Sequence, residues 1–560
     1  MDIVQSIENR IKEALAQAAE AAKEAGELSF GALPDFVLEV PREKNHGDFA
    51  TNLAMLLTRE AKKAPRQIAD SIVKYFNKQG TWVKDIAIAG PGFINFRLDS
   101  RWLYKVIPQV LEEGQAYGTS NVGQGKKVQV EFVSANPTGL LHMGNARGAA
   151  LGDTIASLLS AAGFDVTREY YINDAGNQIE NFGLSLEARY LQALGQDVPF
   201  PEEGYHGEDL IATVQGFIKE HGEKYLESDP QERRGVLVQY ALHEKLSHIR
   251  NVLAEFGVNY DVWFSEKSLH DSGAVARVIE ELRSKGYIYE KDGALWFKTT
   301  EFGDEKDEVV VRANGVPTYF AADIAYHLNK FERGFEWVIN LWGADHHGHV
   351  ARMKGAVKAL GYNPDRLDVV LMQLVRLFSG GELVRMSKRT GQYVTLSELM
   401  EEVGRDAARY FFVMRSADSH LDFDLDLAKS QSAENPVFYV QYAHARICSI
   451  LRQAKEAGVT VPALGEANPE LLQDPSELEL LRKIADFPGL IAGAAVALEP
   501  HRLTRYAHEL AGLFHSFYTN CRVLNIEPEL SAARLQLVEA TRITLNNLLN
   551  LIGVSAPERM

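Results

Sequence analysis

Cysteine is nearly absent from this chain, with only Cys448 and Cys521 among 560 residues. Two thiols cannot build a disulfide framework or a four-cysteine zinc site. Both lie in apolar stretches with helical spacing, a setting typical of buried, unreactive thiols. The sequence therefore excludes the small disulfide-rich secreted class.

Long apolar runs are also missing, since none approaches the roughly 20 residues that a membrane-spanning helix needs. The first 26 residues predict an amphipathic helix and lack the basic start and apolar middle of a signal peptide. We therefore expect a cytoplasmic protein without a membrane partner.

Basic residues are outnumbered, with 59 Lys and Arg against 76 Asp and Glu and a net charge of -17. This balance argues mildly against a nucleic-acid partner, because phosphate contacts need cations. A large protein can be acidic overall and still carry a local basic face. The length itself predicts three or four domains.

Periodicity predicts an α/β fold with a Rossmann-like parallel-sheet core, an N-terminal α+β domain and a C-terminal all-α bundle. The core prediction depends on an apolar strand at 126–134, a Gly-rich loop, a helix that stops at Gly163 and a further strand. Such a crossover implies a parallel sheet that binds ligands at the carboxyl ends of its strands. The expected divisions are 1–115, 116–380 with a helical insertion at about 190–260, a connector at 381–431, and 432–560.

The loop after the first core strand reads EFVSANPTGLLHMGNARGAALGD from Glu131 to Asp153. His142 and Gly144 stand where the helix begins, and a helix N-terminus is a ready anion site. A histidine there adds a donor that can stabilise charge on a triphosphate under attack. The glycine spacing fits neither the dinucleotide fingerprint nor the Walker loop. A plain Gly-rich turn with a surface histidine remains the alternative.

HMGN, preceded by ANPTG, resembles the HIGH signature of class I aminoacyl-tRNA synthetases, and the arginine enzymes are the nearest match through SANPTGxLHxGxxRGAxxGD. Asn145 departs from the second histidine of that signature, but an amide can still donate a hydrogen bond. The resemblance implies catalytic roles for His142 and Asn145, and ATP binding by Pro137, Thr138, Gly139, His142, Gly144 and Asn145.

The segment LVRMSKRTGQYVTL resembles the KMSKS signature of the same family, with Arg385 in place of the first lysine and Lys388 kept. Cations there would neutralise charge on departing pyrophosphate. A merely solvated basic loop is the alternative for this motif alone, and the pairing with HMGN argues against it. The resemblance makes Lys388 catalytic and implies ATP contacts from Met386, Ser387, Lys388 and Arg389.

A guanidinium substrate requires planar acceptors, which carboxylates supply best. Glu131 ends the first core strand, and Tyr319 and Asp323 share a helical face four residues apart. The resemblance implies that Glu131, Ser134 and Asn136 hold the polar groups of arginine, while Tyr319 and Asp323 line the guanidinium pocket. An ordinary half-buried tyrosine beside a solvated aspartate is the alternative.

Two further segments follow expected strands. In LWGADHHGHV, clustered histidines suggest a metal, but adjacent residues on a helix diverge and no cysteines complete a zinc set. We expect no bound metal there; instead Asp345 caps the helix, and Gly343, Asp345 and His346 border the adenosine. In INDAGNQI, a pocket wall and a turn in which Asp174 caps the following helix remain equally open.

The helical C-terminal part resembles the anticodon-binding bundle of the family. Aromatic residues interleaved with arginine suit unstacked RNA bases, although a buried aromatic stripe is the alternative for any single residue. The implied tRNA contacts are Tyr439, Gln441, Tyr442 and Arg446, together with Asn45 in an N-terminal domain that grips the outer corner of tRNA.

The resemblance thus implies an arginine–tRNA ligase, which we expect to be a monomer, with arginine, the tRNA for arginine and ATP with Mg2+ as its substrates. Arginyl-adenylate and pyrophosphate would form first, and arginine would then pass to the terminal ribose. The rival readings are another nucleotidyltransferase or class I synthetase, and a non-catalytic tRNA-binding relative. An adenylate-formation assay separates the last of these from the prediction.

Overall fold

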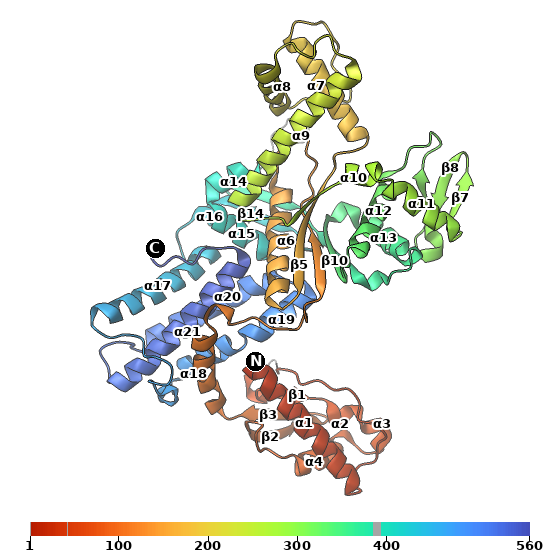
Figure 1. Ribbon diagram of the computed structural model, residues 1–560. Helices are drawn as coiled ribbons and strands as arrows, with labels where there is room; N and C mark the ends of the chain where they lie inside the picture. The colour runs from red at the N-terminus through yellow and green to blue at the C-terminus, as the bar shows by residue number, and fades with distance from the viewer. Residues whose placement is uncertain (1, 42, 385–393) are drawn as a thin grey trace.

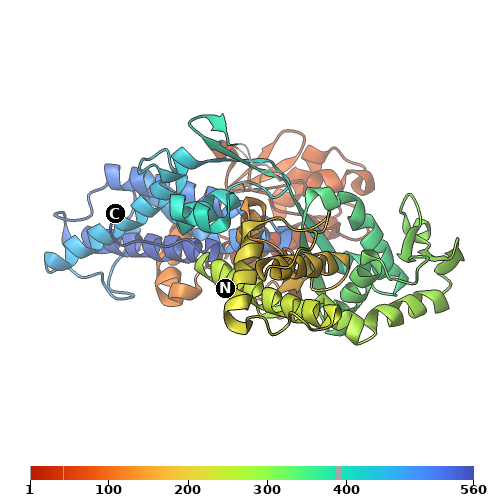
Figure 2. The same ribbon diagram turned by 90° about the horizontal axis from the view of Figure 1, so that it is seen from above.

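The computed structural model describes residues 2–41, 43–384 and 394–560. A parallel sheet and the long helix α6 occupy the centre (Figure 1). The C-terminal bundle and the β7–β9 sheet lie on opposite sides of this centre in both views (Figures 1 and 2). Within the described residues, no helix combines the length and apolar character needed to cross a membrane.

The N-terminal unit packs helices on a three-stranded antiparallel sheet in the order β1-β3-β2. The expected Gly-rich hairpin joins β2 to β3, whose residues pair antiparallel from Ala89↔Phe93 outward. Helix α1 buries one face of alanines, leucine and isoleucines against this unit. The elements are α1 (Ile3–Glu24), β1 (Phe49–Thr51), α2 (Leu53–Leu56), α3 (Thr58–Ala61), α4 (Pro65–Tyr75), β2 (Val83–Ala89) and β3 (Phe93–Leu98).

The central sheet has five strands in the order β11-β10-β4-β5-β6, and every pairing is parallel. The predicted Rossmann-like fold is therefore confirmed. Because the chain goes from β4 to β5 on one side and β10 lies on the other, the strand order reverses between β4 and β10. Ligands bind at such a switch point in open α/β sheets. The strands are β4 (Lys127–Glu131), β5 (Asp165–Ile172), β6 (Val262–Ser265), β10 (Trp337–Gly343) and β11 (Leu367–Met372).

Helix α6 (Met143–Ala161) links β4 to β5 and is buried on nearly every side. Gly152 makes this possible, because a Cβ at that position would lie 2.2 Å from the ring of Phe132. The helix ends before Gly163, which has a φ of +87° as expected for a helix stop. One end of α6 therefore opens at the switch point while the rest belongs to the core.

A helical arm interrupts the sheet between β5 and β6 (Figure 1, top). It consists of α7 (Asn177–Ala193), α8 (Glu208–His221) and α9 (Pro230–Glu255), which enclose a small core of their own. The arm begins at Asn177 rather than near residue 190, because Phe182, Leu186 and Tyr190 on α7 already face that core.

Between the arm and the C-terminal bundle the chain builds two further three-stranded sheets, β7-β8-β9 and β13-β12-β14. Sequence periodicity did not predict the first, because its strands are only four residues long. The elements are α10 (Glu266–Asp271), α11 (Ala274–Ser284), β7 (Ile288–Lys291), β8 (Ala294–Phe297), β9 (Glu308–Val311), α12 (Tyr319–Glu332), α13 (His347–Ala359), β12 (Val375–Ser379), β13 (Glu382–Leu383), α14 (Leu396–Val403), α15 (Arg405–Val413), β14 (Leu421–Asp424) and α16 (Leu425–Lys429).

The C-terminal bundle is all helical, as predicted. Apolar residues at three- and four-residue spacing bury the facing sides of its long helices. Helix α5 (Val106–Glu113) packs against α21, so the bundle also contacts the start of the core. Its helices are α17 (Pro436–Glu456), α18 (Pro475–Ala485), α19 (Phe487–Ala497), α20 (His501–Asn520) and α21 (Pro528–Ile552).

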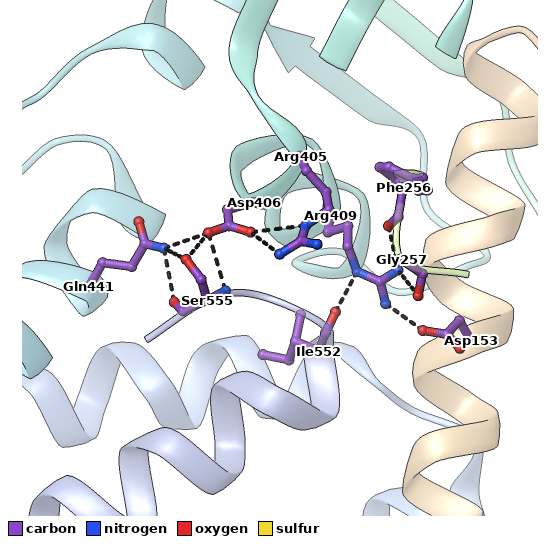
Figure 3. A network of polar contacts seen from close by, with 9 residues as sticks. All are labelled: Asp153, Phe256, Gly257, Arg405, Asp406, Arg409, Gln441, Ile552 and Ser555. Atoms are coloured by element: carbon purple, nitrogen blue, oxygen red, sulfur yellow. Dashed lines mark hydrogen bonds and ion pairs between the residues drawn. The ribbon is translucent and has the colours of Figure 1, made fainter. Parts of the chain in front are cut away.

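Arg409 on α15 joins the bundle to the core (Figure 3). This residue is 0% exposed and forms an ion pair with Asp153 on α6, with 2.6 Å between Nη2 and Oδ2. It also donates to the carbonyl of Ile552 at the end of α21 (2.8 Å) and to that of Phe256 after α9 (3.1 Å). At Gly553 a Cβ would lie 2.5 Å from the guanidinium, so glycine is required for this approach.

Candidate active site

The turn from β4 into α6 is built around His142, the N-cap residue of the helix. Its Nδ1 accepts a hydrogen bond from the Gly144 backbone at 3.2 Å, and the His142 backbone N–H donates to Asn145 Oδ1 at 3.0 Å. This reciprocal arrangement is a capping box. Asn145 therefore orients the start of the helix, which explains how an amide can stand at this position.

A cavity of about 670 Å³ lies over this turn at the carboxyl ends of β4 and β10. The N–H groups of the first turn of α6 point toward this cavity, so the N-terminal end of the helix favours an anion there. Pro137 lies in the same loop but is not among the lining residues. The predicted residues that line the cavity are Ser134, Asn136, Thr138, Gly139, His142, Gly144, Asn145, Gly343, Asp345 and His346.

The second motif falls mostly outside the described residues: Met386, Ser387, Lys388 and Arg389 lie between 384 and 394. The described residues that follow it are joined to the His142 turn. The Leu396 backbone N–H donates to the Leu141 carbonyl at 2.9 Å, and Thr395 pairs with His142 as an antiparallel bridge. The chain therefore returns from that motif directly beside the start of α6.

A smaller cavity of about 220 Å³ adjoins the first, because the loop after β5 borders both: Asn173 lines the larger and Gly176 the smaller. Tyr319, at the start of α12, and Glu266, at the start of α10, line the smaller cavity. Tyr319 is 51% exposed and Glu266 only 3%. This cavity thus offers a buried carboxylate beneath an accessible aromatic ring.

Burial, and then the charge of nearby Asp323, raise the pKa of Glu266 to about 7. Asp323 does not line the smaller cavity; its carboxylate is 3.0 Å from His349 Nε2. Asp174 adds further negative charge near Glu266. A cation that entered this cavity would relieve the repulsion among these carboxylates. Sequence reasoning missed Glu266, whose only signal was an acidic residue directly after a short strand.

One expectation about a helix cap is wrong, and one alternative left open for a second cap is excluded. Asp345 does not cap α13: its side chain is 82% exposed, and its carboxylate lies 3.7 Å from His346 Nε2. Asp174 does not cap α7; it accepts instead from the backbone of Lys267 (2.8 Å) and from Ser265 Oγ (2.6 Å), so it caps α10. Gly176 is the N-cap residue of α7, and Gly343 precedes the short helical turn at 344–346. In both places the acidic side chain is directed elsewhere.

The histidines after β10 lie around one aromatic ring. Both His346 and His349 are near Trp342, and His349 also contacts Asp323. In the described part of the chain, no group of three or more His, Cys, Asp or Glu side chains is arranged to hold a metal ion.

Three of the predicted RNA-facing residues of α17 lie close together. Arg446 lies against the ring of Tyr518 (4.4 Å) and lines a cavity of about 590 Å³ together with Tyr442. Tyr439 packs on the rings of His508 and His515, and His515 also lies near Tyr442.

Gln441 faces the segment after α21 (Figure 3). Its amide donates to Asp406 (2.9 Å) and to the Ser555 carbonyl (3.0 Å). These bonds tie α17 to α15. In the N-terminal unit, Asn45 lines a cavity of about 780 Å³ that also includes Arg482 of α18.

A parallel sheet with a helix N-terminus at its switch point, a cavity with a buried carboxylate beside it and a C-terminal helical bundle together match a class I aminoacyl-tRNA synthetase. Comparison with protein families agrees: 106–424 match the catalytic domain of class I (R) tRNA synthetases, 5–98 the arginyl tRNA synthetase N-terminal domain and 440–560 the DALR anticodon binding domain. The chain belongs to the arginyl-tRNA synthetase family.

Its relatives include the arginine–tRNA ligases of Moorella thermoacetica, 70% identical, and Heliobacterium modesticaldum, 66% identical, each covering 100% of both chains. The solved arginyl-tRNA synthetase of Thermus thermophilus is 24% identical, with a TM-score of 0.73 over 99% of this chain and 100% of that one. That structure supports the fold, while the sequence relatives confirm the family predicted from the two motifs.

Proposed function

We infer that this chain joins arginine to its tRNA using ATP. The observation that carries this inference is the pair of adjoining cavities, one over a helix N-terminus and one containing a buried carboxylate. An arginine carboxylate oxygen attacks the α-phosphorus, the bond to pyrophosphate breaks, and arginyl-adenylate forms. A hydroxyl of the terminal ribose of tRNA then attacks the arginyl carbonyl, and AMP leaves.

ATP, with Mg2+ on its phosphates as part of the substrate, lies across the larger cavity. The α6 N-terminus and His142 contact the phosphates, Asn145 holds that turn, and Gly343 with His346 borders the adenosine. Lys388 neutralises the departing pyrophosphate. The arginine carboxylate is already ionised at neutral pH, so no residue needs to act as a strong base. Positioning and charge neutralisation therefore account for the rate.

Arginine extends from the larger cavity into the smaller one. Ser134 and Asn136 face its amino end, while Glu266 and Tyr319 receive the guanidinium and Asp323 adds negative charge close to Glu266. Carboxylates suit this planar group because they accept its N–H groups in pairs. The α17 surface around Arg446 holds anticodon bases, and the N-terminal unit around Asn45 holds the outer corner of tRNA. The enzyme acts as a cytoplasmic monomer.

Charging total tRNA with each of the amino acids in turn tests this function. The expected result is ATP-dependent attachment of arginine alone. Attachment of a different amino acid would contradict the inference, as would tRNA binding without adenylate formation, which is the behaviour of a non-catalytic relative.

The KM for arginine is expected to fall as the pH rises through about 7, because only ionised Glu266 attracts the guanidinium. Below that pH the protonated carboxyl binds weakly, and the apparent affinity scales with the ionised fraction, giving about a tenfold change between pH 6 and 8. Arginine itself stays charged over this range. The assay is charging at varied arginine, with Glu266→Gln as control: its KM should be high and independent of pH. A flat wild-type profile would contradict the role of Glu266.

A further inference from the structure

A row of three buried polar residues crosses the central sheet. Asn340 on β10, Glu131 on β4 and Glu169 on β5 are in register, so their side chains share one face of the sheet. Helix α12 covers this face and supplies a cation to each carboxylate. Lys330 Nζ lies 2.6 Å from Glu131 Oε2, and Arg333 lies 2.6 Å from Glu169 Oε2.

Lys330 is 0% exposed, so protein groups surround its ammonium in place of water. Besides Glu131, it donates to Asn340 Oδ1 at 2.8 Å. The Asn340 amide donates in turn to His327 Nε2 (2.7 Å), and His327 Nδ1 donates to the Asp323 carbonyl (2.8 Å). Burial lowers the pKa of His327, which suits a neutral ring with one donor and one acceptor.

The second oxygen of Glu131 reaches the loop that carries the arginine contacts. Glu131 Oε1 accepts from Ser134 Oγ at 3.0 Å, and Ser134 Oγ accepts from the Tyr171 backbone at 3.1 Å. Val133 and Ser134 are both left-handed, with φ of +68° and +41°. Such backbone persists only where its surroundings hold it.

Glu131 is absent from the lining of both cavities, whereas Ser134 and Asn136 line the larger. We propose that Lys330 and Glu131 are positioning residues for arginine: their buried ion pair fixes the left-handed turn at Val133 and Ser134, and with it the direction in which Ser134 and Asn136 face the substrate. Glu131 thereby acts through Ser134 rather than by touching arginine. This proposal rests on the proposed function.

The test is Lys330→Met, assayed by tRNA charging with arginine and ATP varied separately. Removing the cation leaves Glu131 buried and uncompensated, so the turn relaxes. The KM for arginine is expected to rise at least about tenfold, because a misplacement of about 1 Å costs on the order of a hundredfold. The KM for ATP is expected to change less than about twofold, because the His142 turn does not contact this pair.

The double variant Glu131→Gln with Lys330→Met should return the KM for arginine to within about threefold of wild type. A glutamine keeps an acceptor for Ser134 without an unpaired charge. A purely structural contribution of Lys330 would move the thermal midpoint without this selective rise and return of the KM for arginine. Arg333→Met is the matched control, since it breaks a similar pair one strand away that does not reach Ser134. It should lower the thermal midpoint without raising the KM for arginine.

An unchanged KM for arginine in Lys330→Met, or a failed rescue, overturns the proposal. Should Lys330→Met not fold, Asn340→Leu takes its place: it removes one acceptor that holds Lys330, and about a threefold rise in the KM for arginine is expected. No rise there also overturns it. If the wild-type chain does not attach arginine to tRNA, the proposed function is wrong. If the wild type does so and Lys330→Met has the same KM for arginine, only the present proposal is wrong.

Discussion

Replacing His142 by alanine is expected to lower kcat for arginine charging by about a hundredfold or more. A donor aimed at charge that develops in the transition state typically contributes two to three powers of ten. The alanine also loses the hydrogen bond from Gly144 that caps α6, which costs about 1 kcal/mol of helix stability. The rate effect should therefore far exceed any change in thermal midpoint. Single-turnover adenylate formation measures it directly.

His142→Asn is the matched control. Asparagine is a good N-cap residue and keeps one donor, so its rate should lie between those of the wild type and the alanine variant. If His142→Ala charged tRNA at the wild-type rate, the triphosphate could not lie over this turn, and the assignment of the larger cavity to ATP would be wrong.

Replacing Arg409 by methionine is expected to lower the free energy of unfolding by about 3 kcal/mol or more. The change removes one of the two cations paired with buried Asp153 and also strips donors from buried carbonyls. Asp153 keeps its second partner, Arg168, at 3.1 Å, which limits the loss. Urea unfolding followed by circular dichroism gives the midpoints of the wild type and the variant. Each transition is compared separately, because the chain has several domains.

Arg405→Met provides the control four residues away on the same helix (Figure 3). Arg405 contacts Asp406 at 3.4 Å with a side chain that is 45% exposed, and such pairs contribute about 0–1 kcal/mol. Equal destabilisation by the two variants would show that burial at Arg409 does not matter.

The two motifs predicted the family because each is contiguous in sequence. His142, Gly144 and Asn145 follow one another at a helix start, where capping chemistry leaves a local pattern. Glu266 and Lys330 could not be found this way. Each is an ordinary charged residue until the fold brings it to a cavity or beneath a strand, and the pairing of Lys330 with Glu131 spans 199 residues.

The fold, too, was predictable only where its signals are contiguous in sequence. The parallel core was predicted because a strand, a Gly-rich loop and a long helix follow one another, and the strand and helix show clear hydrophobic periods. The β7–β9 sheet was missed because four-residue strands carry too few alternations to be read. Helix caps could not be predicted where an acidic residue bonds to a helix distant in the chain, as Asp174 does to α10. The direct contacts of the site residues with substrates stay predictions.

Helix α6 begins at the His142 turn. Asp153, which pairs with Arg409, lies about 15 Å further along the helix at 1.5 Å per residue. A helix is stiff over so short a span, so the His142 turn and Asp153 keep a fixed position relative to each other. The guanidinium of Arg409 couples α6 to the last turn of α21 in the anticodon-binding bundle. We therefore expect a shift of Ile552 to be transmitted through Arg409 and α6 to the His142 turn.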